Sequence, residues 1–297
     1  MDNRFRYKRT DLASECKSKD IVSGTSDNGI IYTEEERDGF KLSLLDITDK
    51  RGEEIIGKPV GRYITIDVGK VWTMTESDFD ACASLLSSQL SQMLERATNI
   101  SVPDNVLVVG LGNRYITSDA LGHETLKNVI VTRHIKDHNA GLYASLGGRS
   151  VCAIAPGVIG QTGIESLEII RGATIKVHPQ AVIVIDALAA VELSHLATTV
   201  QITDTGIAPG SGIGNRRMRI DKESLGCPVI AIGVPTVVES STLVYAALEE
   251  AGITDIDASL KNVLENGRGF FVTPKESDIV TTELARLLSE AINLALS

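Results

Sequence analysis

The segment 105–124 constrains the fold more than any other part of this 297-residue chain. After Asn105 comes VLVV (106–109), an unbroken β-branched and aliphatic run that is typical of a strand buried on both faces of a parallel sheet. The turn GLGN follows, and helical spacing resumes after Asp119. A strand, a turn and a helix in this order indicate an α/β fold.

The rest of the chain alternates between strand-like and helical segments. The strand-like runs are SVCAIAP, AVIVIDAL, TTVQITDT and CPVIAIGVP, and the helical runs are 76–98, TGIESLEIIRGAT, 239–251 and 278–296. We also expect the run ALAAVELSHL, directly after Asp186, to be helical. This alternation predicts a βαβ sheet within one α/β domain.

The N-terminal region has a different pattern. Residues 30–71 are β-like and interrupted by Gly, Asp and Lys, which predicts a β-rich addition to the α/β domain. Residues 1–28 are polar and aperiodic, which predicts an extended or mobile arm, and the first eleven of them contribute little to the core.

Composition excludes several classes of protein. The net charge of −10 argues against a general nucleic-acid binder, because such proteins need a basic face. No apolar run could span a bilayer and the N-terminus has no signal-peptide segment, so we expect a cytoplasmic protein without membrane contact. The four cysteines form no C-x-x-C pair, which excludes the usual zinc and redox spacings. We expect no cofactor.

Common catalytic and nucleotide-binding motifs are incomplete. The run Gly110-Leu111-Gly112 would need a third glycine at position 115 to bind a dinucleotide, but that residue is Tyr115. No P-loop is present. A zinc-protease motif would need a second histidine where Lys127 stands, and no G-x-S-x-G elbow predicts a serine hydrolase.

Carboxylates remain as the candidates for catalysis. Asp119 and Asp186 both follow strand-like runs, and the carboxyl ends of parallel strands meet at one edge of a sheet. Asp67 and Asp204 also follow such runs, and the commonest role of one such aspartate is to cap a helix. Two converging carboxyl groups would share either a proton, which supports acid–base hydrolysis, or a metal ion, which polarises the substrate. The sequence leaves both alternatives open.

Five blocks of sequence resemble the germination protease family, whose members degrade small acid-soluble spore proteins. The blocks occur in family order and cover roughly residues 9–241. They are GLGNRYITSDALGHE, APGVIGQTGIES, PQAVIVIDALAA, TDTGIAPGSGIGNRR and GVPTVVES.

The resemblance implies a fold, a site and partners. The fold would be a twisted, largely parallel sheet flanked by helices, similar to the hydrogenase-maturation proteases. Asp119 and Asp186 would be the catalytic pair, and Gly112 and Asn113 would contact the substrate. The protein would be a homotetramer in the forespore or spore core, acting on small acid-soluble spore proteins without binding nucleic acid directly.

The resemblance also implies an inactive precursor that removes its own N-terminal segment. The run TDLASE at 10–15 is similar to the family's substrate site, with the scissile bond between Asp11 and Leu12. Residues 1–11 would then be a propeptide that enters the cleft extended, and 12–297 a single peptidase domain. Two rival functions are a nickel-hydrogenase maturation protease and a catalytically silent protein that binds spore proteins.

Overall fold

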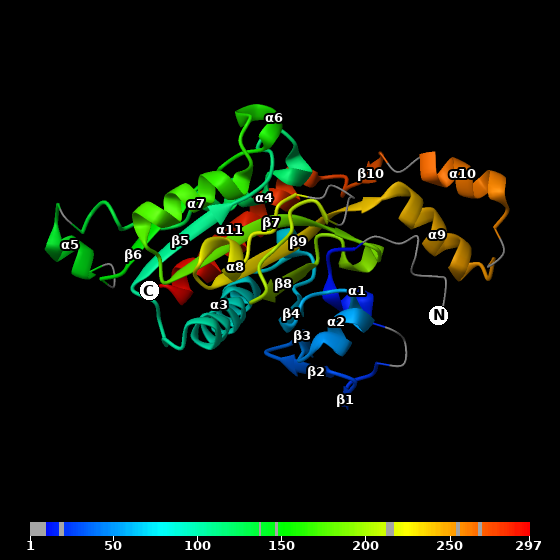
Figure 1. Cartoon of the computed structure of the whole chain (residues 1–297), viewed down its shortest axis with the longest axis horizontal. Helices are drawn as coiled ribbons and strands as arrows, with labels where there is room; N and C mark the ends of the chain where they lie inside the picture. Colours follow the sequence, from blue (N-terminus) through cyan, green and yellow to red (C-terminus); the bar gives the residue numbers. More distant parts are fainter. Residues whose placement is uncertain are drawn as a thin grey trace.

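The computed structural model describes residues 10–17, 21–136, 138–145, 148–211, 217–253, 256–266 and 269–297. The strands are β1 (Thr25–Asp27), β2 (Ile30–Arg37), β3 (Phe40–Ile47), β4 (Gly61–Asp67), β5 (Asn105–Gly110), β6 (Ser150–Ile154), β7 (Ala181–Ala190), β8 (Thr199–Thr203), β9 (Val229–Glu239) and β10 (Phe271–Val272). They form one sheet in the order β1-β2-β3-β4-β8-β9-β7-β5-β6, with β10 paired to β9 (Figure 1).

Helices lie on both faces of this sheet. The α-helices are α1 (Ala13–Cys16), α2 (Lys50–Ile56), α3 (Glu76–Thr98), α4 (Leu121–Leu126), α5 (Ala140–Ser145), α6 (Ile159–Thr162), α7 (Ser166–Val177), α8 (Lys222–Leu225), α9 (Ser240–Glu250), α10 (Ala258–Asn266) and α11 (Ser277–Ala295). Short 3-10 turns among the described residues include η2 (Val71–Thr73), η3 (Thr117–Asp119) and η4 (Leu193–His195). None of the helices in the described parts of the chain has the length and apolarity that a membrane span requires.

Strands β6, β5, β7 and β9 form the parallel part of the sheet. On one face, α3 and α11 pack with Ile183 and Ile185 of β7. On the other face, α7 packs with Val182 and Val184. Because both faces are covered, β7 is apolar at successive positions rather than at alternate ones. The predicted buried strands and the helices α3, α7, α9 and α11 are confirmed.

The N-terminal strands continue the same sheet in antiparallel fashion. Strand β8 pairs antiparallel with β9, and β4, β3, β2 and β1 follow in turn. A separate cluster that includes Ile30, Tyr32 and Tyr63 supports these strands. The predicted fold class is therefore confirmed, with the β-rich addition as an edge of one mixed sheet rather than a separate layer.

Two predictions about local structure are wrong. The run after Asp186 is not helical, because β7 continues to Ala190 and stays paired with β9 as far as Val238. Burial overrides the helical propensity of its alanines, since Leu188, Ala189 and Ala190 are all buried.

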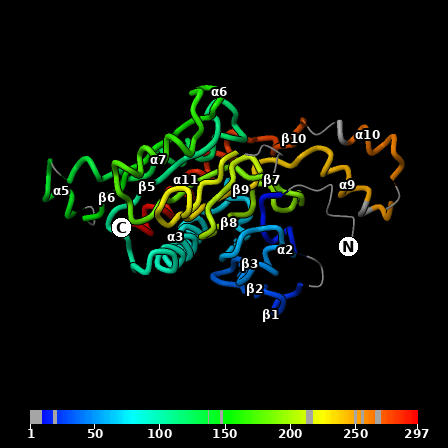
Figure 2. Tube along the Cα trace, viewed as in Figure 1, coloured from blue at the N-terminus to red at the C-terminus, as the bar shows by residue number. Residues whose placement is uncertain are grey.

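The second wrong prediction concerns the N-terminal arm. Residues 10–13 pack against the middle of the sheet, beside β7, β8 and β9, whereas Thr25–Asp27 form the edge strand β1 (Figure 2). Leu12 and Ala13 are fully buried, and Ala13–Cys16 form one helical turn instead of an extended strand. Residues 1–9, the greater part of the expected propeptide, lie outside the described residues.

Candidate active site

Asp186 occupies the position where β7 outruns its neighbour. Strand β5 ends at Gly110, which pairs with Ile185. Asp186 is thus the first residue of β7 that β5 no longer flanks, and it borders the crevice beyond the carboxyl end of β5. The predicted edge is correct, although Asp186 lies inside its own strand rather than at its end.

Asp119 is carried by η3, and neighbouring elements fix this turn. The backbone N–H of Asn113 donates to Oδ2 of Asp119 at 2.8 Å. Thr236 of β9 donates its hydroxyl to the carbonyl of Ser118 at 2.5 Å, and Thr281 of α11 donates to the carbonyl of Thr117 at 3.3 Å. The position of Asp119 therefore depends on its own turn and on two parts of the chain that are distant in sequence, β9 and α11.

Gly112 allows the turn that holds Asp119 to close, so we expect Gly112→Ala to disrupt the site. Its φ of +96° is unfavourable for other residues, and a Cβ at this position would lie 2.0 Å from the carbonyl oxygen of Asp119. We expect a loss of roughly 2–4 kcal/mol in the free energy of unfolding and a loss of most activity. Denaturant unfolding and peptide cleavage assays measure the two effects.

Gly39→Ala is the matched control for this substitution. Gly39 also has a positive φ, +82°, but nothing lies within 4 Å of its would-be Cβ. Gly39→Ala should lose only about 1–2 kcal/mol in the free energy of unfolding, from the strained backbone, and should keep its activity. Normal turnover by Gly112→Ala would contradict the role given to the turn.

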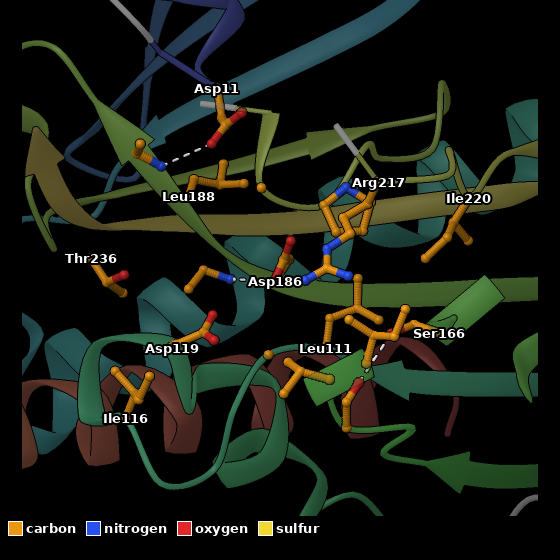
Figure 3. A pocket seen from close by; sticks show the side chains of 18 of the residues that line it. Asp11, Leu111, Ile116, Asp119, Ser166, Asp186, Leu188, Arg217, Ile220 and Thr236 are labelled. Carbon is orange, nitrogen blue, oxygen red and sulfur yellow. Dashed lines mark hydrogen bonds between the residues drawn. The ribbon is translucent and has the colours of Figure 1, made fainter. Parts of the chain in front are cut away.

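A cavity of about 270 Å³ brings the two acids together with Asp11 (Figure 3). Its apolar wall includes Leu111, Ile116, Val158, Leu188 and Ile220. Gly112, one of the residues expected to contact substrate, lines this cavity. Asn113, the other, is not among its lining residues and acts instead through its hydrogen bond to Asp119.

The surroundings of the two acids favour a proton on Asp186 rather than on Asp119. Burial raises the pKa of Asp119, and the hydrogen bond from Asn113 partly opposes this shift. Asp186 is only 4% exposed, and its pKa lies well above the ordinary value because of burial and the nearby charges of Asp119 and Asp11. Asp119 therefore loses its proton first, and its charge then helps Asp186 to retain one.

We expect Asp186→Asn to stabilise the fold at neutral pH. Above the unfolded-state pKa of 3.8 the unfolded carboxyl ionises, whereas the folded one keeps its proton. The wild-type chain therefore loses stability as pH rises from 3.8 toward the raised folded value. The asparagine cannot ionise, so the variant should gain roughly 1–3 kcal/mol at pH 7.

Thermal unfolding at pH 4 and pH 7 tests this expectation. The difference in Tm between variant and wild type should be a few degrees at pH 7 and should shrink at pH 4. A variant that is less stable than wild type at pH 7 would contradict the assignment of Asp186 as a buried, proton-retaining acid.

The N-terminal segment lies beside this acid pair. The backbone N–H of Asp11 donates to the carbonyl of Ala189 at 2.9 Å, and Oδ2 of Asp11 accepts from the N–H of Ala189 at 3.0 Å. Ser211 donates to Oδ1 at 2.6 Å. Leu12 enters an apolar cluster with Leu188, Ala190 and Val238.

Two side chains from the antiparallel half hold the carbonyl groups of this segment. Lys58 Nζ donates to the carbonyl oxygens of Thr10 and Asp11, both at 3.1 Å. Gln201 of β8 donates to the Asp11 carbonyl at 3.4 Å and accepts from the N–H of Ala13 at 2.7 Å. Gln201 and Asp186 share one row of the sheet, since each pairs with Gly233 from opposite sides.

The other acids considered from the sequence have local roles. Asp67 is exposed at the end of β4, where Oδ1 accepts from the N–H of Gly69 at 3.0 Å. Asp204 accepts from the N–H of Arg62 at 2.8 Å and forms an ion pair with Arg96 at 3.1 Å. Across the described residues, no group of three or more His, Cys, Asp or Glu side chains is arranged to hold a metal ion.

Comparison with known proteins identifies the family. The family model described as germination protease matches residues 8–251. The chain belongs to the germination protease family. The germination protease of Caldanaerobacter subterraneus subsp. tengcongensis is 41% identical and aligns with 97% of this chain and 94% of its own length. That of Bacillus subtilis is 42% identical over 79% of this chain and 64% of its own length.

A solved structure gives a weaker match. The [NiFe] hydrogenase maturation protease HycI from Thermococcus kodakarensis is 16% identical to this chain, with a TM-score of 0.38. The match covers 70% of this chain and 98% of the HycI chain.

As a member of the germination protease family, this chain is a protease of spore germination.

In this member of the germination protease family, the five blocks of sequence that resemble the family converge on one cavity. Each block contributes lining residues, among them Gly112 and Asp119, Gly157 and Ser166, Asp186 and Leu188, Gly210 and Arg217, and Thr236. Lys58 and Gln201 lie outside those blocks, and nothing in their local sequence distinguishes them from surface or strand residues. Only the docked segment shows that they face a peptide.

Proposed function

We propose that the chain is an endopeptidase that cuts small acid-soluble spore proteins through Asp119 and Asp186, after first cutting itself between Asp11 and Leu12. The observation that carries this proposal is the docked TDLASE segment, whose Asp11 lines the same cavity as the two acids. A run that is similar to the family's substrate site thus lies beside the carboxylate pair.

The electrostatics support a division of roles within the pair. Ionised Asp119 takes a proton from a water molecule, and the resulting hydroxide attacks the carbonyl carbon of Asp11. Protonated Asp186 then donates its proton to the amide nitrogen of Leu12 as the C–N bond breaks. The products are a carboxyl group at Asp11 and an amine at Leu12. The pair again holds one proton, now on Asp119, and its transfer to Asp186 restores the starting state.

Lys58 and Gln201 supply the remaining requirement of this reaction. The carbonyl oxygen of the scissile bond gains negative charge when hydroxide attacks, and donors placed at that oxygen lower the barrier. Lys58 Nζ at 3.1 Å provides a full positive charge there, and Gln201 a second donor. Asp11 also lines a neighbouring cavity of about 320 Å³ that contains both donors, so it contacts the donor side as well as the acid side.

Assembly and location remain proposals based on the family resemblance. We propose a homotetramer that acts in the forespore or spore core and binds no nucleic acid directly. Analytical ultracentrifugation of the purified chain tests the first point, and a monomer at micromolar concentration would contradict it.

Incubation with a purified small acid-soluble spore protein tests the proposed function. We expect discrete fragments in mass spectrometry, each cut between an acidic and a large apolar residue, and none with Asp186→Asn. Stable binding of the spore protein without fragments would instead support the rival of a catalytically silent binding protein.

A further inference from the structure

A second carboxylate of the N-terminal segment is bound at the far end of β7. The Glu15 side chain is only 2% exposed. Its Oε2 accepts from the backbone N–H of Val191 at 2.8 Å, and its Oε1 accepts from that of Glu192 at 3.0 Å. His195 Nδ1 lies 2.7 Å from Oε1, and the hydroxyl of Thr10 donates to Oε2.

The fold explains why a carboxylate can be buried at this point. Strand β7 ends at Ala190, so the next two backbone N–H groups are available to an acceptor outside the sheet. The turn η4 then directs His195 back toward the same position. The hydrogen bond to Glu15 raises the pKa of His195, which favours its charged form, with smaller contributions from Glu192 and Asp67.

These groups form a complete receptor for one carboxylate. A buried, ionised side chain is unfavourable unless donors or opposite charge compensate its lost hydration. Two backbone donors and the His195 ring, whose charged form the carboxylate favours, provide this compensation from outside the segment. Hydrogen bonds to charged groups are about twice as strong as neutral ones, so the receptor distinguishes a carboxylate from an amide.

The receptor lies at a fixed distance from the proposed cut. Leu12 is buried in its apolar cluster, and α1 forms the single helical turn that brings Glu15, the fourth residue after the Asp11–Leu12 bond, into the receptor. A peptide that places an apolar side chain directly after the cut and an acidic one three residues later can therefore occupy both positions at once.

We propose that Val191, Glu192 and His195 form the subsite that recognises an acidic side chain four residues after the scissile bond of substrate proteins. This inference rests on the proposed function, because it assumes that the chain's own segment leaves its position after the cut and that added substrate then binds there. The occupant is a glutamate-containing peptide in a helical turn, and His195 is a specificity-determining residue that takes no part in the chemistry.

Two synthetic peptides test the subsite. One copies residues 4–20 of this chain, and the other is identical except for glutamine at position 15. We expect the autoprocessed wild-type enzyme to cleave the glutamate peptide with a kcat/KM about 10–100-fold higher, mainly through a lower KM, because the group is remote from the reacting bond. Equal cleavage of the two peptides would overturn the subsite.

Variants of His195 assign the preference to this residue. His195→Leu should reduce the preference for the glutamate peptide at least several-fold. His195→Gln keeps a hydrogen-bond donor, so its preference should lie between those of the wild type and His195→Leu. His134→Leu, at an exposed histidine, should leave the preference unchanged. A purely structural role of His195 would instead lower cleavage of both peptides by the same factor, and that result would remove His195 from the subsite.

The outcomes separate this inference from the proposed function. If the wild-type chain cleaves neither peptide and never processes itself, the proposed function fails, and the subsite fails with it. If it cleaves both peptides equally at the expected bond, the proposed function stands and only the subsite fails. The wild-type comparison of the two peptides decides the question even if His195→Leu does not fold.

Discussion

Asp119→Asn and Asp186→Asn should each fold and yet lower peptide hydrolysis by at least about 10³-fold, because paired catalytic groups act as a unit. Asparagine has nearly the shape of aspartate but can neither accept the proton of water nor donate one to the leaving nitrogen. Both side chains border one cavity, and burial raises both pKa values, so each replacement removes one of the two proposed proton-transfer groups. Steady-state cleavage of the residue 4–20 peptide, in variants shown by circular dichroism to be folded, measures the effect.

Two further variants calibrate this result. Asp67→Asn changes an exposed acid outside the cavity and should keep most of its activity. Lys58→Met removes the charged donor to the scissile carbonyl and should lower kcat by about 10²–10³-fold with little change in KM. Near-normal turnover by soluble Asp119→Asn or Asp186→Asn would remove the replaced aspartate from the catalytic role.

The intact chain should lose residues 1–11 under activating conditions and gain Leu12 as its new N-terminus. The Asp11–Leu12 bond is the one whose carbonyl Lys58 and Gln201 hold, next to the cavity of the acid pair. Leu12→Asp should block this step, because a carboxylate would enter a fully buried apolar cluster at a cost of roughly several kcal/mol. Intact-mass spectrometry over time follows the processing.

The control for this substitution keeps the apolar character of the side chain. Leu12→Met has a similar volume and should still be processed, although more slowly. A chain that begins at residue 13 should cleave added substrate, because its acid pair is unchanged. An active wild-type enzyme with an unchanged N-terminus, or one trimmed at an unrelated bond, would contradict self-cleavage at this position.

The C-terminal end of β7 is not predictable from its local sequence pattern. The run AVIVI predicts a buried strand because local apolar character is enough to indicate one. The run ALAA that follows Asp186 has helical propensity, yet it remains a strand because β9 continues to pair with it. Pairing between distant segments has no signature in a short window of sequence, so the end of this strand could not be predicted.

The N-terminal segment likewise differs between its sequence pattern and its place in the structure. Its polar and aperiodic sequence predicts a free arm, whereas Leu12, Ala13 and Glu15 each enter a specific position on the folded sheet. Those positions consist of groups from β7, β8, β9 and the turn after β7, which no local pattern connects. The resemblance identified the substrate-like run, and only the structure assigned Lys58, Gln201 and His195 to it.

By itself, the sequence determined the α/β class and the buried strands, because burial on both faces leaves a local pattern, and it nominated two aspartates that the structure brings to one cavity. The tertiary structure decided which groups face the docked peptide and how the two acids differ in their hold on a proton. The first depends on strand register across β7, β9 and β8, and the second on burial and the distances between charges. Both are properties of residues far apart in the chain, and they exist only once the sheet has formed.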